Sequence, residues 1–155
     1  MSSVVDIGSG TGKFCVAGAL ATRCRFAGLE HRPALVGAAR ALADTFGVGD
    51  RVTFSHGAFG ERPVPEADAY YLYNPFGENL FGRPDQLDAV VELSDARYRR
   101  DVSAVEAFLE DTRPGSYLVT YNGFGGDPPP SYEGLFADWS TPSLLRLFRK
   151  RDPTA

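Results

Sequence analysis

Three glycines at alternating positions could hold a nucleotide against bare main chain. Gly8, Gly10 and Gly12 follow the largely apolar residues 4–7 and precede a helix-forming segment that begins at Lys13. Residues 4–7 favour a strand, whereas glycines adopt backbone conformations closed to larger residues and let a ligand approach with no Cβ atom in the way. A strand that breaks into such a turn and then a helix is typical of nucleotide-binding sites.

Spacing separates this turn from two other glycine loops. A P-loop has a Gly-Lys pair followed by Ser or Thr, but here Phe14 follows Gly12 and Lys13, and Ile7 stands where the first glycine of a P-loop belongs. A dinucleotide fingerprint would place its third glycine at position 13, so a nicotinamide or flavin site is disfavoured but stays open. The remaining pattern, D-x-G-x-G-x-G, begins at Asp6.

This pattern resembles the first motif of the class I S-adenosylmethionine-dependent methyltransferases. The resemblance implies S-adenosyl-L-methionine as the cofactor. The cofactor-binding residues that it implies in the turn are Asp6, Gly8, Ser9, Gly10 and Gly12. Asp6 is expected to form hydrogen bonds with main-chain groups of the turn and so to fix its shape.

A second strand end supplies an acid for the same ligand. Residues 26–30 predict a strand that ends in Glu30. A carboxylate at a strand tip can accept hydrogen bonds from both ribose hydroxyls of an adenosyl group. Taken alone, such a glutamate is more often solvated, but the glycine turn upstream favours the ribose-binding role.

The third predicted strand end departs from the resembled family. Many members have an acid there that accepts a hydrogen bond from the adenine amino group, and Ala58 occupies that position. The base must then be bound by main-chain groups or by another side chain. Phe59 could stack on it, although a loop aromatic that covers the core is an equal alternative.

The fourth predicted strand end could face the transferred methyl group. Asn74-Pro75-Phe76 resembles the Asn-Pro-Pro-Phe motif of methyltransferases that act on amino nitrogens, with one proline missing. The resemblance implies that Asn74 touches the cofactor and orients the nucleophile, and that Tyr73 and Phe76 form a wall. The alternative for Asn74 and Pro75 is a turn that ends the strand.

Alternating strand and helix patterns predict an α/β fold with a Rossmann-like, doubly wound sheet. The sheet is expected to be mostly parallel, with helices on both faces and a C-terminal antiparallel edge. The predicted strands are residues 4–7, 26–30, 52–55, 69–73, 116–121 and 144–149. The predicted helices are residues 13–21, 33–46, 85–93 and 97–109.

Length and composition bound the remaining possibilities. The 155 residues predict a single domain, residues 1–155. A formal net charge of −4 disfavours nucleic acid as a partner and leaves a small molecule or a protein as the substrate. Cys15 and Cys24 form no disulfide framework and no metal cluster, and neither a signal peptide nor a membrane span is evident. We therefore expect a cytoplasmic protein without a metal.

Three functions remain open. Methyl transfer from S-adenosyl-L-methionine to a nitrogen or oxygen nucleophile is favoured. A nicotinamide-dependent Rossmann oxidoreductase is the first alternative, and Lys13 speaks against it. A non-catalytic adenosyl-binding module is the second, because position 58 lacks an acid and the sequence begins at the first strand. Members of the resembled family usually carry helices before that strand. Either this chain is a minimal version with an open site, or N-terminal helices are missing, and the second alternative is favoured.

Overall fold

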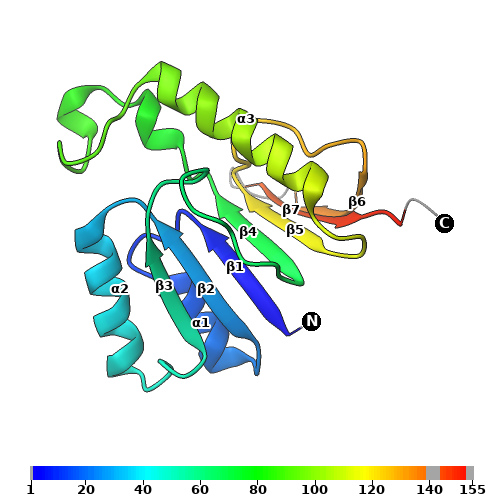
Figure 1. Cartoon of the computed structure of the whole chain (residues 1–155), viewed down its shortest axis with the longest axis horizontal. Helices are drawn as coiled ribbons and strands as arrows, with labels where there is room; N and C mark the ends of the chain where they lie inside the picture. The colour runs from blue at the N-terminus through cyan, green and yellow to red at the C-terminus, as the bar shows by residue number, and fades with distance from the viewer. Residues whose placement is uncertain (1, 139–143, 153–155) are drawn as a thin grey trace. The chain divides into compact units, whose positions relative to one another are not determined.

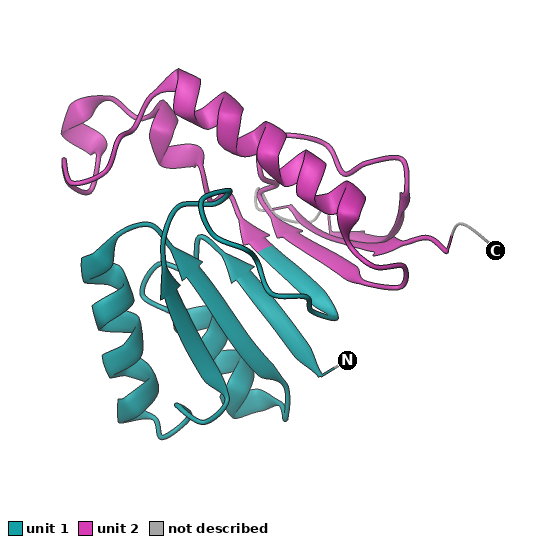
Figure 2. Ribbon diagram, viewed as in Figure 1, with its two compact units in different colours: residues 1–71 teal, residues 72–155 magenta. Residues whose placement is uncertain are grey.

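The computed structural model describes residues 2–138 and 144–152, in two compact units, Met1–Tyr71 and Leu72–Ala155 (Figure 2). Seven strands form a mostly parallel sheet in the order β3-β2-β1-β4-β5-β7-β6, and its C-terminal edge is antiparallel. The Rossmann-like α/β class and the antiparallel edge are thus confirmed. The single domain expected over the chain stays a prediction.

The first unit contains a parallel layer of strands with two helices beside it (Figure 1). Its elements are β1 (Ser3–Ile7), α1 (Lys13–Ala21), β2 (Arg25–Glu30), α2 (Pro33–Thr45) and β3 (Val52–His56). Strand β4 (Ala69–Tyr73) runs across the boundary between the units. In the register of β1, β2 and β3, Asp6 lies opposite Gly28, and Glu30 lies opposite His56. The carboxyl ends of these three strands therefore lie at one edge.

Small residues let the helices of the first unit approach its strands closely. Both α1 and α2 contact β2 and β3, and they contact each other. The helix residues buried in these contacts are Cys15, Val16, Ala19, Val36, Ala39 and Ala43. Burial of this apolar surface, at roughly 25 cal/mol per Å², holds the parallel layer in place.

The second unit consists of α3 and the strands that follow it. Its elements are the 3₁₀ turns η1 (Gly77–Leu80) and η2 (Arg83–Asp85), helix α3 (Asp95–Asp111) and strands β5 (Tyr117–Tyr121), β6 (Tyr132–Asp138) and β7 (Leu145–Lys150). Ser94 caps the N-terminus of α3, and its hydroxyl accepts a hydrogen bond from the main-chain N–H of Arg97 (3.1 Å). At its other end the buried Lys150 ammonium donates to the carbonyl oxygens of Leu109 and Glu110, both at 2.8 Å.

The helix predicted over residues 85–93 is wrong. Only the short turn η2 forms, and the chain after it is irregular. Acidic side chains take the main-chain N–H groups there: Leu87 N–H donates to Glu78 Oε1 (2.6 Å), and Val90 N–H donates to Asp88 Oδ1 (2.9 Å). Such side-chain acceptors compete with helical hydrogen bonds, and the sequence pattern does not reveal which set wins.

Strand β6 was not predicted. It pairs antiparallel with β7, and its register shifts between Gly134 and Phe136. This bulge breaks the alternation of apolar and polar residues by which a strand is recognised in a sequence. The other strand predictions are confirmed to within two residues of their ends.

Candidate functional site

The loops after β1 and β3 are tied to the end of β2. The main-chain N–H groups of Gly8 (2.9 Å) and Ser9 (3.0 Å) both donate to the carbonyl oxygen of Leu29. From the other side, the N–H of Gly57 donates to the carbonyl oxygen of Glu30 (3.0 Å). The carboxyl edge of β1, β2 and β3 thus forms one hydrogen-bonded assembly, which we call the cradle (residues 6–12, 29–32 and 56–61).

The carboxylate of Glu30 lies at the centre of the cradle. It is 6 % exposed, and its Oε2 accepts a hydrogen bond from the N–H of Gly10 (3.0 Å), while Oε1 accepts one from the N–H of Arg32 (2.8 Å). A carboxylate offers about four acceptor positions, so two remain after these bonds. Glu30 therefore faces the glycine turn, with acceptor capacity left for a ligand.

Two glycines of the turn serve different purposes. Gly10 and Gly12 both have left-handed backbones, with φ of 54° and 75°. A Cβ atom on Gly12 would lie 2.9 Å from the Cβ of Ala39, so helix α2 leaves no room for a side chain there. A Cβ atom on Gly10 would meet no heavy atom within 4 Å. Gly12 is thus required for packing, whereas Gly10 borders open space beside Glu30.

Asp6 binds a different partner from the one expected. Among the described residues, its hydrogen bond comes from the thiol of Cys15 on α1 (Sγ to Oδ2, 3.6 Å), not from the main chain of the turn. Successive side chains of a strand point to opposite faces of the sheet, and Asp6 points to the face that α1 covers. This orientation brings it to Cys15. Burial raises the pKa of Asp6 from 3.8 to about 7; the Cys15 hydrogen bond opposes this rise, and the charge of Glu30 adds to it. Burial likewise raises the pKa of the Cys15 thiol, which stays protonated.

The raised pKa of Asp6 predicts a pH-dependent stability. The folded state holds this proton more tightly than the unfolded chain, so the stabilisation is complete below the ordinary value of 3.8 and is lost as the pH rises to about 7. We expect Asp6→Asn to remove this dependence, so that its stability relative to the wild type increases over that pH range. Urea unfolding at several pH values measures the difference. Asp50→Asn, at an exposed position, is the control; a constant difference for Asp6→Asn would contradict the prediction.

Ser9 contributes a donor to the cradle. Its buried hydroxyl has no hydrogen-bond partner among the described residues, and a Cβ atom on Gly28 would lie 2.6 Å from its oxygen. The hydroxyl therefore fills the space that a side chain on β2 would take. A buried hydroxyl without a partner indicates where a ligand or a water molecule would complete a hydrogen bond.

An acid does reach the loop after β3, three residues beyond the position at which it was expected. Ala58 is buried, and its main-chain N–H donates to Oε2 of the exposed Glu61 (3.3 Å). Phe59 is half-buried and pairs with Arg62. The sequence analysis did not select Glu61. The feature that could have identified it is a carboxylate three residues after Ala58 in the same loop.

The predicted acceptor-facing residues lie in the second unit. Asn74 is exposed and has a left-handed backbone with φ of 39°, and its N–H donates to the carbonyl oxygen of Gly123 (3.0 Å). Tyr73 is 55 % exposed and meets the ring of Tyr121 edge-on, with 4.8 Å between centroids. Phe76 is buried, and its part in the predicted wall stays a prediction. The contact of Asn74 with a cofactor stays a prediction.

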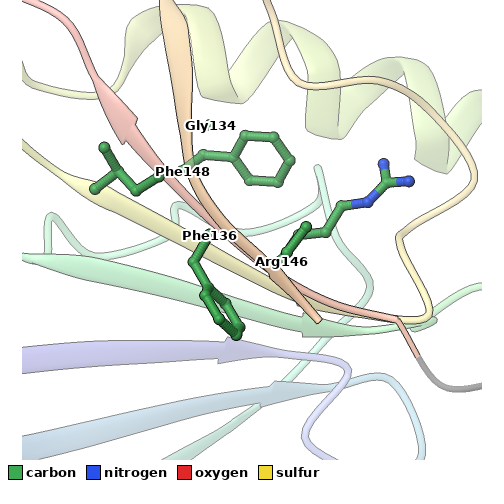
Figure 3. Close-up of a pocket in the computed structure, with 6 residues that line it drawn as sticks. Gly134, Phe136, Arg146 and Phe148 are labelled. Carbon is green, nitrogen blue, oxygen red and sulfur yellow. The ribbon is translucent and has the colours of Figure 1, made fainter. Parts of the chain in front are cut away.

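The second unit also has a hollow at its antiparallel edge. Phe136 of β6 and Arg146 and Phe148 of β7 line a cavity of about 480 Å³ (Figure 3). None of the predicted site residues belongs to its described lining. This cavity is therefore not part of the predicted cofactor site.

No group of three His, Cys, Asp or Glu side chains in the described part of the chain is placed to hold a metal ion. No helix there has both the length and the apolar character needed to cross a bilayer.

Comparison with solved structures reveals the same fold. No family model matches this sequence, and no curated protein sequence matches it. An RNA methyltransferase from Salinibacter ruber, solved with S-adenosyl-L-homocysteine, is similar over 97 % of this chain and 82 % of its own, with a TM-score of 0.68 and 22 % identity.

Two further structures cover nearly all of this chain. An O-methyltransferase family 2 protein from Planctomyces limnophilus, in complex with apigenin, matches 96 % of it with a TM-score of 0.68 and 16 % identity; the match covers 50 % of the larger protein. The [4+2]-cyclase SpnF matches 97 % of this chain and 75 % of its own, with a TM-score of 0.65 and 15 % identity. The chain therefore has the Rossmann-like fold of the class I S-adenosylmethionine-dependent methyltransferases, as its glycine turn predicted.

Proposed function

We propose that this protein transfers a methyl group from S-adenosyl-L-methionine to a nitrogen or oxygen nucleophile. The observation that carries the proposal is the pairing of Glu30 with the N–H of Gly10, beside open space. This arrangement combines bare main chain with an acid that has acceptors left for two hydroxyls. Three of the structures with similar folds were solved with S-adenosyl-L-homocysteine, the product of such a transfer.

The loop after β3 fits the adenine part of the cofactor. Adenine presents an acceptor, N1, next to a donor, its amino group. The N–H of Ala58 and the carboxylate of Glu61 are a donor and an acceptor side by side. In the structure the N–H of Ala58 donates to the Glu61 carboxylate at 3.3 Å. We propose that adenine replaces this hydrogen bond with two, from the N–H of Ala58 to N1 and from the amino group to Glu61.

The bound cofactor would supply a methyl group already activated on a sulfonium centre. The residues of the chain then need to bind and orient rather than to form covalent bonds. Positioning of this kind can lower the activation free energy by roughly 7–11 kcal/mol. Asn74 would orient the nucleophile through its amide oxygen, and an amine that arrives deprotonated needs no general base.

Calorimetric titration with S-adenosyl-L-homocysteine tests the proposal directly. We expect one site per chain, no binding of NAD, and transfer of a radiolabelled methyl group from S-adenosyl-L-methionine to an acceptor in a screen of amines and hydroxyl compounds. Binding of NAD in preference to the adenosyl ligand would establish the oxidoreductase alternative and overturn the proposal.

A second candidate is an adenosyl-binding protein that transfers no methyl group. It is favoured by one comparison, since the similar structure SpnF is described as a [4+2]-cyclase and the fold is thus found with another reaction. The two candidates differ in one measurement: binding of S-adenosyl-L-homocysteine without methyl transfer to any screened acceptor supports the second. We further propose a small-molecule or protein acceptor and a cytoplasmic setting, for which the reduced thiol of Cys15 is the support.

Exchange of Glu61 for glutamine tests the adenine contact. We expect Glu61→Gln to lower the affinity for S-adenosyl-L-homocysteine by about tenfold, because a charged acceptor is replaced by a neutral amide. S-Inosyl-L-homocysteine has a carbonyl oxygen in place of the amino group, and a glutamine amide can donate to it, so the affinity for this ligand should not fall. Glu66→Gln, at another exposed glutamate of the first unit, is the matched control. Equal losses for both ligands would remove Glu61 from the adenine contact.

Replacement of Asn74 separates turnover from cofactor binding. We expect Asn74→Gly to lower kcat by at least about tenfold, since the amide that orients the nucleophile is lost. Glycine adopts the left-handed backbone of position 74 without strain, so the loop should keep its shape. The affinity for S-adenosyl-L-homocysteine should fall by much less than kcat. Full activity of Asn74→Gly in a methyl-transfer assay would show that the Asn74 side chain has no role in turnover and that only its left-handed backbone matters.

A further inference from the structure

The segment from Leu80 to the start of α3 contains more large apolar side chains that are at least half exposed than any stretch of comparable length among the described residues. Four large apolar side chains of this segment are more than half exposed: Leu80 (56 %), Phe81 (52 %), Leu87 (63 %) and Val90 (71 %). Apolar surface in water costs roughly 25 cal/mol per Å², and concentrations of it usually mark a binding site.

This exposure occurs on a backbone that hydrogen bonds hold in place. The buried Asn79 donates to the carbonyl oxygen of Phe76 (3.0 Å) and accepts from the N–H of Ser94 (3.3 Å). The side chain of Gln86 donates to the carbonyl oxygen of Phe81 (3.1 Å). The apolar side chains are therefore presented by a tethered loop.

The same loop lines an open-sided cavity of about 680 Å³. This volume lies in the range of about 300–1,000 Å³ that is typical of small-molecule sites. Its apolar lining includes Phe81, Val91 and Leu93, and its charged lining is Arg83, Asp88 and Glu92. Small-molecule sites commonly combine an apolar lining with a few polar groups in this way.

The charge of residues 78–92 indicates the charge of the ligand that the cavity would bind. Between Glu78 and Glu92 the sequence has four acids and one base, Arg83. Both acids that line the cavity also hold local groups, since Asp88 accepts from the N–H of Val90 and Glu92 lies 4.0 Å from the guanidinium of Arg100. A carboxylate can accept further bonds beyond these. The excess of acids favours a cation over an anion.

We propose that this cavity, in the second unit, binds a small organic cation with an apolar body, such as an arylalkylamine. The apolar body would cover Phe81, Val91 and Leu93, and the ammonium group would lie against Asp88 and Glu92. The site contains none of the residues of the cradle, so the inference does not rest on the proposed methyl transfer.

Three probes with one ring system and different charges test the proposal. Tryptamine is cationic, indole-3-ethanol is neutral and indole-3-propionate is anionic. In calorimetric titration of the whole chain we expect tryptamine to bind about tenfold more tightly than the neutral probe, and the anion to bind least. Added salt should weaken the binding of tryptamine alone. Equal affinities for the three probes, or no binding of tryptamine, would overturn the proposal.

Paired variants locate the site. The double variant Asp88→Asn with Glu92→Gln should lose about tenfold in tryptamine affinity, and Phe81→Ser should weaken all three probes. The control, Asp111→Asn with Asp127→Asn, removes two exposed acids outside the cavity and should change nothing. Thermal melting verifies that each variant is folded.

The cradle supplies the remaining comparison. We expect Glu30→Gln to leave tryptamine binding unchanged, and the double variant at Asp88 and Glu92 to leave S-adenosyl-L-homocysteine binding unchanged. Loss of tryptamine binding in Glu30→Gln would assign the probe to the cradle and overturn the proposal. Failure of S-adenosyl-L-homocysteine binding alone would contradict the methyl-transfer proposal and leave this one standing.

Discussion

Gly12→Ala is expected to lower the free energy of unfolding by about 2–5 kcal/mol. The left-handed backbone at position 12 costs an alanine roughly 1–2 kcal/mol, and overpacking against α2 adds about 1–3 kcal/mol. The overpacking follows from geometry, since the new methyl group would lie 2.9 Å from the Cβ of Ala39 and 2.7 Å from Cε1 of Phe54. Urea unfolding followed by circular dichroism measures the change.

Gly10→Ala is the matched control, because it places the same methyl group in the same turn. Its backbone is also left-handed, but no heavy atom lies within 4 Å of the added Cβ. We expect a loss of only about 1–2 kcal/mol in stability, together with a loss of about tenfold or more in affinity for S-adenosyl-L-homocysteine. Equal stability losses in the two variants would mean that α2 does not constrain Gly12.

Removal of the Glu30 carboxylate is expected to have the largest effect on ligand binding. Glu30→Ala would remove the acceptors proposed for two ribose hydroxyls. Hydrogen bonds to a charged group contribute about 1.5–3 kcal/mol each, so the affinity for S-adenosyl-L-homocysteine should fall by roughly 100-fold or more. Calorimetric titration measures this loss.

The same substitution also tests the cradle without a ligand. The N–H groups of Gly10 and Arg32 lose their acceptor, and a buried donor left unsatisfied costs about 1–3 kcal/mol. Glu30→Gln keeps the shape of the side chain and one carbonyl acceptor, so it should lose about half of that stability. A variant at Glu30 with wild-type affinity for S-adenosyl-L-homocysteine would refute the proposed ribose contact.

The centre of the cradle could be predicted from sequence because its requirements are local. Gly8, Gly10 and Gly12 all have positive φ, and few residues other than glycine adopt that conformation readily. Glu30 ends a strand, so its place at the carboxyl edge follows once the strand is recognised. Residue type and position in an element were sufficient in both cases.

The remaining contacts depend on the packing of distant or irregular segments. Cys15 meets Asp6 only because α1 packs against the layer of strands, and Glu61 reaches Ala58 only through the shape of one loop. The irregular segment after η2 reflects competition between side-chain and main-chain acceptors, whose energies differ little. A sequence pattern does not reveal which of two sets of hydrogen bonds forms when their energies differ so little.

The buried ammonium of Lys150 has a practical consequence for shortened versions of the chain. Besides its two bonds to the end of α3, it donates to the hydroxyl of Ser131 (3.0 Å), so one side chain of β7 fastens two separate segments, the end of α3 and the start of β6. A truncation that stops before position 150 would release both at once. Trimming for crystallisation or for fusion should therefore spare β7 through its last residue.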